Sequence, residues 1–287
     1  MRLATLFAGL LATALFAAPA SARIWQKSWS TTGRPTIHVT TNDGQVTVHR
    51  GKAGAVSARI EYKVKIWGWS SEPREPLIDL QQNGDVVTIV AKERGSVVVF
   101  GGISEDFTIE VTVPEDCDLD VSSGDGSIEV DPGKGRYNLT TSDGHITVDR
   151  LRGEIRLVTQ DGNISGEGLD GALEARSGDG RVAVNGRFDR LSVHSGDGRV
   201  DVTARQGSRP ASPWSVTTTD GSLTMRIPQD LPVMLDAACG DGRLSVDLPV
   251  NVSGGLTRHT LRGQLNGGNQ ALKLRTTDGN LTIALAD

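Results

Sequence analysis

Five nine-residue stretches in the middle of the chain decide the fold. They read SGDGSIEVD (residues 123–131), TSDGHITVD (141–149), TQDGNISGE (159–167), SGDGRVAVN (177–185) and SGDGRVDVT (195–203). Each begins 18 residues after the one before it, and similarity at a fixed period indicates a repeat architecture. An Asp-Gly pair marks a tight turn in every stretch, and the alternating apolar and polar residues that follow are typical of a short strand.

The Asp-Gly pair recurs beyond these five stretches. Asp43-Gly44 precedes them, and after residue 198 the steps between pairs lengthen to 23, 21 and 37 residues, which indicates insertions at corners. We predict that the pairs of the repeat form a structural column of turns, with these residues: Asp125, Gly126, Asp143, Gly144, Asp161, Gly162, Asp179, Gly180, Asp197, Gly198, Asp220, Gly221, Asp241, Gly242, Asp278 and Gly279.

Each 18-residue repeat splits into two units of nine residues, and each unit is one strand and one turn. Place six of the unit is always large and apolar or aromatic, as in Ile128 and Tyr137, and place eight is mostly apolar. Two topologies fit: a β-solenoid with two strands per coil, or an antiparallel meander with Asp-Gly hairpins. Place one is polar, and leucines such as Leu151 fall out of phase as at a corner, which favours the solenoid. The predicted fold is all-β: a right-handed parallel β-solenoid of 18-residue coils with an N-terminal β cap.

The chain divides into three predicted parts. Residues 1–22 resemble a secretory signal, with one charge, a short apolar run and the small residues Ala-Ser-Ala before the expected cleavage. Residues 23–112 contain longer alternating strands and are predicted to be a β cap, because an open coil end is an unpaired edge. Residues 113–287 form the repeat domain. No later stretch is apolar for the roughly 18 residues that a membrane span needs, so we expect an exported chain, in the periplasm, at the cell surface or secreted.

Composition excludes several classes of protein. The net charge of −5 is a mild acidic excess, so we expect no nucleic-acid partner. Glycine is abundant, with 35 residues, which argues against a helical bundle. Two cysteines cannot make a disulfide framework, and Cys117 and Cys239 lie several coils apart, too far for a bridge.

The repeated pattern [ST]-x-D-G-x-[ILV]-x-[VLM] resembles that of the bacterial DUF4097 family, whose members are described as adhesins. The pattern follows a signal-like segment and the strand-like Val113-Pro114-Glu115-Asp116, and the resemblance covers roughly residues 33–287. It implies an extracytoplasmic β-solenoid with a surface or adhesion role. The family carries no catalytic motif to transfer, so neither catalytic residues nor a cofactor are expected from it.

The aspartate column has two interpretations. Nine-residue repeats that bind calcium exist, but their ligating aspartate stands at place six, which here holds the core residues. The alternative is that each aspartate accepts hydrogen bonds from its own turn, while the glycine adopts a positive φ. Place one carries small polar residues that are predicted to form a hydroxyl ladder: Ser123, Thr141, Thr159, Ser177, Ser195, Thr218, Cys239 and Thr276.

Two further groups are candidates for a ligand surface. Arg181, Arg199 and Arg243 stand at the outward place five, where they are able to bind acidic sugars or phosphates or to balance the aspartate column. Trp67 and Trp69 fall on one face of a predicted strand, as a sugar-stacking platform or as part of the cap.

No catalytic constellation interrupts the repeat, so the favoured function is a non-enzymatic exported protein that acts through its surface, adhesin-like or as an envelope scaffold. Its expected partner is a cell-envelope, glycan or protein ligand. The alternatives are a periplasmic β-helix protein that binds polysaccharide or acts on it through repeated carboxylates, and a calcium-dependent binding module.

Overall fold

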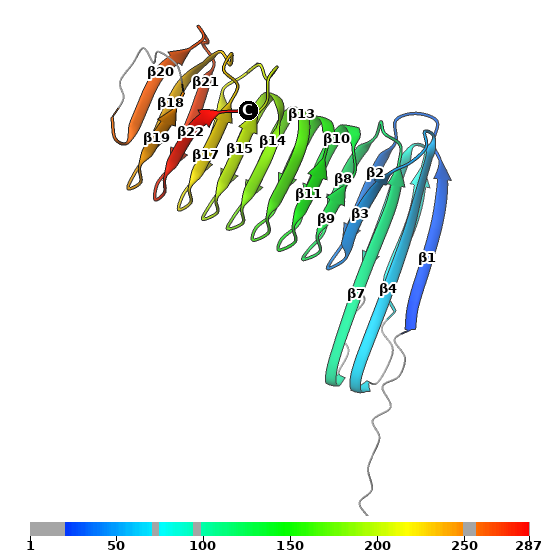
Figure 1. Ribbon diagram of the computed structural model, residues 1–287. Helices are drawn as coiled ribbons and strands as arrows, with labels where there is room; N and C mark the ends of the chain where they lie inside the picture. The colour runs from blue at the N-terminus through cyan, green and yellow to red at the C-terminus, as the bar shows by residue number, and fades with distance from the viewer. Residues whose placement is uncertain (1–20, 71–74, 94–98, 249–256, 287) are drawn as a thin grey trace, which may run out of the picture.

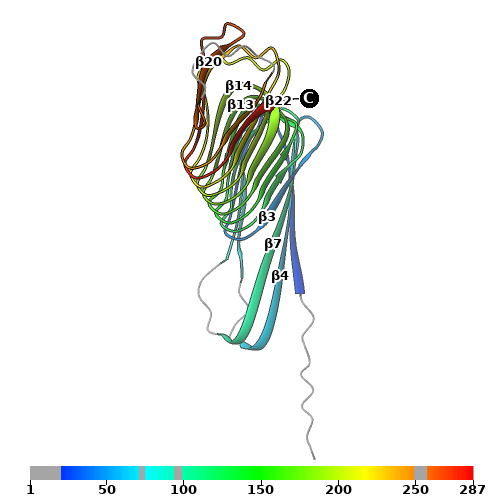
Figure 2. The same ribbon diagram turned by 60° about the vertical axis from the view of Figure 1, so that its left-hand side comes forward.

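The computed structural model describes residues 21–70, 75–93, 99–248 and 257–286, shown in Figure 1. These residues form twenty-two β-strands and no helix, so the all-β prediction is confirmed. Within the same residues no helix is long and apolar enough to cross a membrane. The strands stack side by side into an elongated body (Figures 1 and 2).

The strands form two facing rows. In spatial order the first row is β1 (Ser21–Ser30), β4 (Ala55–Ser70), β7 (Val99–Val113), β3 (Gln45–Arg50), β9 (Ile128–Val130), β11 (Ile146–Asp149), the first halves of β13 (Ile164–Ser177) and β14 (Val182–Ser195), β15 (Val200–Ala204), β17 (Leu223–Ile227), β22 (Leu281–Leu285) and β19 (Leu244–Asp247).

The second row lies across the core from the first. It consists of β5 (Leu77–Asn83), β6 (Val86–Lys92), β2 (Thr36–Thr41), β8 (Asp118–Ser122), β10 (Gly133–Thr140), β12 (Leu151–Val158), the second halves of β13 and β14, β16 (Trp214–Thr218), β21 (Ala271–Thr276), β18 (Val233–Cys239) and β20 (Thr260–Leu265).

Within the repeat, each strand pairs in parallel with the strand 18 residues later. Tyr137 lies opposite Ile155, and Ile146 lies opposite Ile164. The pairing is therefore parallel, as expected for stacked coils, and differs from the antiparallel pairing of a meander. Because the offset equals the repeat, residues of the same place stack on one another.

The core lies between the two rows and is built from places six and eight. The large residues at place six, from Ile128 to Val200, are all buried, as predicted. Leu151 and Leu169 are also buried, where the chain passes from the first row to the second, which agrees with their expected position at a corner. Between β14 and β16, Phe188 packs edge-on against Trp214, with ring centroids 6.4 Å apart.

The order of the coils in space differs from their order in the chain. The coil of β2 and β3 lies between the coil of β6 and β7 and that of β8 and β9. At the other end, the coil of β21 and β22 lies between that of β16 and β17 and that of β18 and β19. An early coil of the chain and a late coil are thus each enclosed between two other coils.

Antiparallel strands flank the stack at both ends. β4 pairs with β1 and β7, β5 pairs with β6, and β20 pairs with β18. The predicted signal segment, residues 1–22, lies outside the described residues except for its last two, which begin β1. The predicted boundary after residue 112 falls one residue before the end of β7, and the predicted cap contributes β2 and β3 to the interior of the stack.

Candidate functional site

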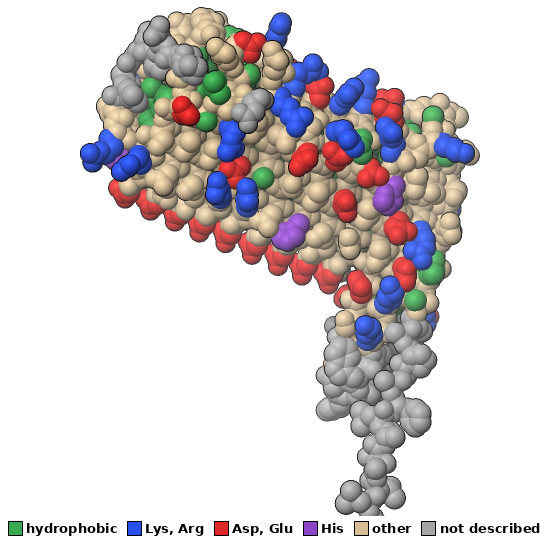
Figure 3. All heavy atoms as spheres, in the orientation of Figure 1, with side chains coloured by type: hydrophobic (Ala, Val, Ile, Leu, Met, Phe, Trp, Pro, Cys, Tyr) green, Lys and Arg blue, Asp and Glu red, His purple; other side chains and the backbone are tan. Residues whose placement is uncertain are grey.

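The Asp-Gly turns form one edge of the stack, where Figure 3 shows a continuous line of acidic side chains. In five turns a hydroxyl accepts a hydrogen bond from the N–H of the turn glycine, and these hydroxyls belong to Thr41, Ser123, Thr159, Ser177 and Ser195. The Ser177 Oγ, for example, accepts from the Gly180 N–H (2.9 Å) and donates to the Gly162 carbonyl of the neighbouring coil (3.0 Å). Thr159 makes the same pair of bonds, to Gly162 (3.1 Å) and Gly144 (3.1 Å). The predicted hydroxyl ladder is confirmed for its serines and threonines, which each donate to a glycine carbonyl of the neighbouring coil. Cys239 departs from it, because its Sγ lies against the His259 carbonyl (3.8 Å).

The turn glycines are required by close approach between coils. A Cβ added at Gly180 would overlap the carbonyl oxygen of Gly162, and one at Gly162 would overlap that of Gly144. The expectation of a positive φ is wrong: the column glycines do not appear among the positive-φ glycines of the described chain. The cause is therefore the tight stacking of turns, which leaves no space for a side chain.

The aspartates of these turns are all exposed. In the described residues, none of the following carboxylates makes a hydrogen bond or an ion pair: Asp125, Asp143, Asp161, Asp179, Asp197, Asp220, Asp241 and Asp278. The expected hydrogen bonds from each turn to its aspartate are therefore not formed, because the hydroxyl ladder takes that role. Like charges stack along this edge, and the pKa of Asp43 is raised by partial burial and, second, by the charge of Asp125.

A cation is the other interpretation of this column. No group of three or more His, Cys, Asp or Glu side chains comes together to hold a metal ion in the part of the chain that the structure describes. The carboxylates follow one another singly, one per coil, and so do not surround a common point. The donor set needed for calcium, which takes six to eight oxygen ligands, is not assembled by these residues.

The three predicted arginines do not form one patch. Arg181 and Arg199 share the carboxylate of Asp201, at 2.7 and 3.1 Å, so they pair with a strand residue and not with the aspartate column as expected. Arg243 stands three coils beyond Arg199, and its backbone N–H donates to the Asn280 side chain (3.0 Å). The Asp201 side chain is only 13% exposed, so the carboxylate that the two arginines share is largely shielded from solvent.

The tryptophans fall in separate places. Trp67 and Trp69 lie in β4, opposite Gly102 and Phe100 of β7, and their side chains lie outside the described part of the structure. Trp214 is fully buried, and its Nε1–H donates to the Asp189 carbonyl at 3.2 Å. Trp214 therefore belongs to the core, whereas the predicted platform lies on the longest strand of the chain.

The two cysteines are free and buried, and lie several strands apart, Cys117 directly before β8 and Cys239 at the end of β18. Burial is the main cause that raises the pKa of Cys117 to about 12, and the charge of Asp118 adds to it. A thiol with this pKa is protonated at neutral pH and does not act as a nucleophile.

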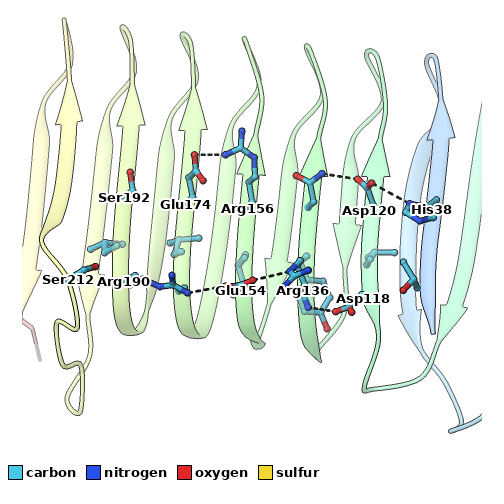
Figure 4. Close-up of a pocket in the computed structure, with 18 of the residues that line it drawn as sticks. His38, Asp118, Asp120, Arg136, Glu154, Arg156, Glu174, Arg190, Ser192 and Ser212 are labelled. Atoms are coloured by element: carbon cyan, nitrogen blue, oxygen red, sulfur yellow. Dashed lines mark hydrogen bonds and ion pairs between the residues drawn. The ribbon is translucent and has the colours of Figure 1, made fainter. Parts of the chain in front are cut away.

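A hollow of about 820 Å³ forms a groove along the outer face of the second row. Its walls carry two lines of polar side chains, one residue per strand, as Figure 4 shows. The first line is Asp118, Arg136, Glu154, Ala172 and Arg190, and the second line is His38, Asp120, Asn138, Arg156, Glu174 and Ser192. We call this hollow the strand groove.

The charges of the strand groove are paired along each line. In the first line, the Arg136 Nε donates to Glu154 (2.9 Å), and Arg190 reaches across the small Ala172 to the same carboxylate (3.0 Å). These two guanidinium groups lower the pKa of Glu154. Glu154 therefore pairs with Arg136 on the neighbouring coil and with Arg190 two coils away, past the uncharged Ala172.

The second line is also joined by polar contacts between neighbouring strands. Asp120 accepts from the Asn138 amide (2.9 Å) and lies 3.4 Å from the His38 ring, while Arg156 pairs with Glu174. Sequence reasoning missed this groove, although a signal existed. Places five and seven of the alternate nine-residue units, compared down the repeat, carry both acidic and basic residues, as Arg136 and Glu154 do at place five.

The comparisons with known proteins identify the family. A family model described as Toastrack DUF4097 matches residues 35–284, so the chain belongs to that family, as the sequence pattern predicted. No curated protein matches the chain.

Two solved structures illustrate what the chain is similar to. A "putative cell adhesion protein" from Clostridium sporogenes is 12% identical, with 93% of this chain and 100% of that chain covered and a TM-score of 0.33. A "putative adhesin" from Bacteroides fragilis is 13% identical, with 92% and 97% covered and a TM-score of 0.39.

Proposed function

We propose that this Toastrack DUF4097 protein is an exported, non-enzymatic, adhesin-like binding protein, and that the strand groove holds its ligand. The observation that carries the proposal is the groove itself, with polar side chains repeated at strand spacing along its length. Neighbouring strands lie about 4.8 Å apart, so the groove offers hydrogen-bonding groups at regular intervals. An extended polymer with regularly spaced hydroxyl groups, such as a polysaccharide, fits that arrangement.

The charge balance of the groove favours a neutral polymer over a strongly acidic one. Its carboxylates and its guanidinium groups pair with one another, so little unpaired charge is left to attract an ionic ligand. Paired groups still offer unused donors and acceptors, because a guanidinium carries five N–H donors. The ligand is therefore recognised by hydrogen bonds and shape.

The lowered pKa of the Glu154 carboxyl supports binding over catalysis. A general acid in glycoside hydrolysis needs a carboxyl group whose pKa is raised. The pKa of Glu154 is lowered by Arg136 and Arg190, which keeps this carboxylate ionised. A binding role without turnover is consistent with that state.

Three finer features belong to the same proposal. We infer that the stack is a right-handed solenoid of 18-residue coils, which is the hand expected for a parallel crossover connection. We also infer that residues 1–22 are removed on export, and that residues 23–112 and 113–287 act as cap and repeat domain. Export, to the periplasm or the cell surface, would place the groove where envelope polysaccharides occur.

The test is a binding assay with residues 23–287 on a panel of neutral and acidic polysaccharides. Wild type is expected to bind a neutral member of the panel, and the double variant Glu154→Ala/Arg190→Ala is expected to bind it at least about tenfold more weakly. The matched control is Arg181→Ala/Asp201→Ala, which removes an ion pair on the first row and should leave binding unchanged. Equal binding by both variants, no binding by wild type, or cleavage of the polymer would overturn the proposal.

A further inference from the structure

In an interior turn of the aspartate column, the amide nitrogen that follows the aspartate is held in place. The Gly162 N–H donates to the Thr159 Oγ1 (3.1 Å), and that hydroxyl donates to the Gly144 carbonyl of the neighbouring coil (3.1 Å). The turn is also bonded on both sides, because the Asp161 N–H donates to the coil before it and the Gln160 carbonyl accepts from the coil after it. An interior turn is therefore closed within itself and fixed between two neighbours.

The last turn of the column, Asp241-Gly242, lacks both restraints. Its place one is Cys239, whose Sγ lies against the His259 carbonyl (3.8 Å), and the Gly242 N–H makes no hydrogen bond within the described chain. The Asp241 N–H donates to the Thr277 carbonyl of the coil before it (3.0 Å), but no further Asp-Gly turn of the described chain stacks on the other side. The strand that follows, β19, pairs with β22 alone among the described strands, and Figure 1 shows it at the end of its row.

The chain beyond the last turn passes its flanks without covering it. The carbonyls of Arg258 and His259 accept from N–H groups on the two flanks of the turn (3.3 and 2.9 Å). Neither residue hydrogen-bonds to Asp241 or Gly242, and no glycine of a further turn in the described chain approaches the Gly242 carbonyl. One side of this turn is therefore open.

Three other turns also lack the bond from glycine to hydroxyl, those of Gly144, Gly221 and Gly279. Each is enclosed, because a neighbouring turn lies in close approach on either side. Their place-one threonines still donate to the glycine carbonyl of the neighbouring coil. At the opposite end of the edge, the Gly44 N–H donates to the Thr41 Oγ1 (3.2 Å). In the described chain, only the last turn combines an unbonded glycine N–H with an open side.

An Asp-Gly pair reacts with itself when its turn opens, because glycine has no side chain to shield its nitrogen. The glycine nitrogen bonds to the aspartate Cγ, and the carboxyl hydroxyl leaves with the amide proton as one water. The resulting succinimide ring then takes up one water. Opening at Cγ restores aspartate, whereas opening at the main-chain carbonyl leaves isoaspartate, in which the chain runs through Cγ.

We propose that Asp241 is a self-modification site, where the chain isomerises through this succinimide faster than at the other aspartates of the column. The reaction brings the Gly242 nitrogen onto the Asp241 Cγ, so the turn has to change its shape. Local opening costs least where few contacts hold a segment, and a neighbouring turn holds this one from one side only. The hydroxyl that occupies the glycine N–H in five other turns is missing here, because place one is Cys239.

The product does not fit the stack. Isoaspartate lengthens the main chain by one atom beside Gly242, where a Cβ would already lie 1.9 Å from the Gly279 carbonyl oxygen. The next strand, β19, is held to β22 through four residue pairs. Isomerisation would therefore release β19 and leave β22 as the end of the first row.

The experiment incubates residues 23–287 at neutral pH for weeks and maps isoaspartate by mass spectrometry after digestion, with an isoaspartate methyltransferase as a second readout. Isoaspartate is expected to accumulate at Asp241 at least about tenfold faster than at Asp161, whose turn is closed and enclosed. The same chain unfolded in urea is the control. There the two rates should agree within about twofold, because both aspartates precede glycine and the fold no longer separates them.

Two reciprocal variants test the cause. Cys239→Ser supplies the missing hydroxyl and should slow the reaction at Asp241 at least about threefold, with no change at Asp161. Thr159→Cys removes the hydroxyl from an enclosed turn, so Asp161 should react faster than in wild type but still more slowly than Asp241. Equal rates at the two aspartates in the folded chain, a difference that persists in urea, or an unchanged rate at Asp241 in Cys239→Ser would each overturn the proposal. The wild-type comparison needs no substitution, so it decides the proposal even where a variant does not fold.

Discussion

The turn edge and the strand groove are built from the same repeat, yet they treat charge in opposite ways. Along the turn edge, aspartate stacks on aspartate, because every coil has the same residue at place three. Along the groove, Glu154 stacks beside Arg136, because the residue at place five changes from coil to coil. Strict repetition is thus confined to positions that close turns, whereas variation lets neighbouring coils pair their charges.

Substituting a glycine of the turn edge should have the largest effect on the free energy of unfolding. Gly180→Ala would force a Cβ onto the Gly162 carbonyl and push two coils apart, which should lower the free energy of unfolding by about 3 kcal/mol. The control is Gly84→Ala, which has open space but a φ of 61°, and should cost about 1 kcal/mol. Urea denaturation measures both, and equal losses would contradict the close-approach explanation.

The hydroxyl ladder should show the next largest effect. Ser177→Ala removes one buried hydroxyl that serves two coils, and should lower the free energy of unfolding by about 1–2 kcal/mol. Ser177→Thr keeps the hydroxyl and should restore most of it. Ser192→Ala, an exposed serine of the groove, should change stability by less than about 0.5 kcal/mol. If Ser192→Ala lost as much stability as Ser177→Ala, the hydroxyl ladder would contribute no more to stability than an exposed serine does.

Removing one carboxylate from the turn edge should have a small effect of the opposite sign, a rise in the free energy of unfolding. Asp43→Asn should raise the free energy of unfolding by no more than about 0.5 kcal/mol, because it removes a partly buried charge and, second, the repulsion of that charge from Asp125. Since the folded pKa of Asp43 is raised, the folded state holds its proton more tightly. This site therefore favours folding more as pH falls through that pKa. Urea midpoints at pH 4–5 and at pH 7 should differ less in the variant; an unchanged difference would contradict the repulsion.

The smallest effect is visible in the titration of one groove carboxyl. Arg136→Ala should raise the pKa of Glu154 toward its ordinary value, because it removes the first cause of the lowered pKa. A carboxyl with a lowered pKa contributes stability above its ordinary pKa and loses it as pH falls through the folded pKa. NMR titration measures the shift, and Arg181→Ala on the other row should leave the Glu154 pKa in place. A Glu154 pKa that stays low in Arg136→Ala would contradict the pairing.

Much of the fold was predictable from local pattern. The alternation around Ile128 and Ile146 predicted strands with buried places six and eight, and the 18-residue period predicted which residues stack. The order of the coils was not predictable, because a repeat shows which segments are alike and not which are adjacent. Nothing in β2 or β22 itself specifies that two other coils will enclose it.

The site was harder to predict than the fold for a related reason. Turn chemistry considered one unit at a time suggested a positive φ at glycine, while the real constraint comes from the carbonyl of the next coil. Similarly, Arg136 and Glu154 are ordinary surface residues in their own units, and their pairing exists only across units. Contacts between repeats decide both features, and a single repeat does not contain that information.

The enclosed coils have a mechanical consequence. A simple stack frays from its ends, since its first and last coils each have one neighbour. Here the earliest stacked coil, β2 with β3, and the latest, β21 with β22, each have two. Tension applied through β22 would load two interior interfaces at once, and the parallel hydrogen bonds on both sides of the strand would have to break together. At the other end of the chain, the edge strand β1 would separate from β4 before the enclosed coil of β2 and β3 is loaded. Such a body resists peeling, a useful property for a molecule that bears pulling loads.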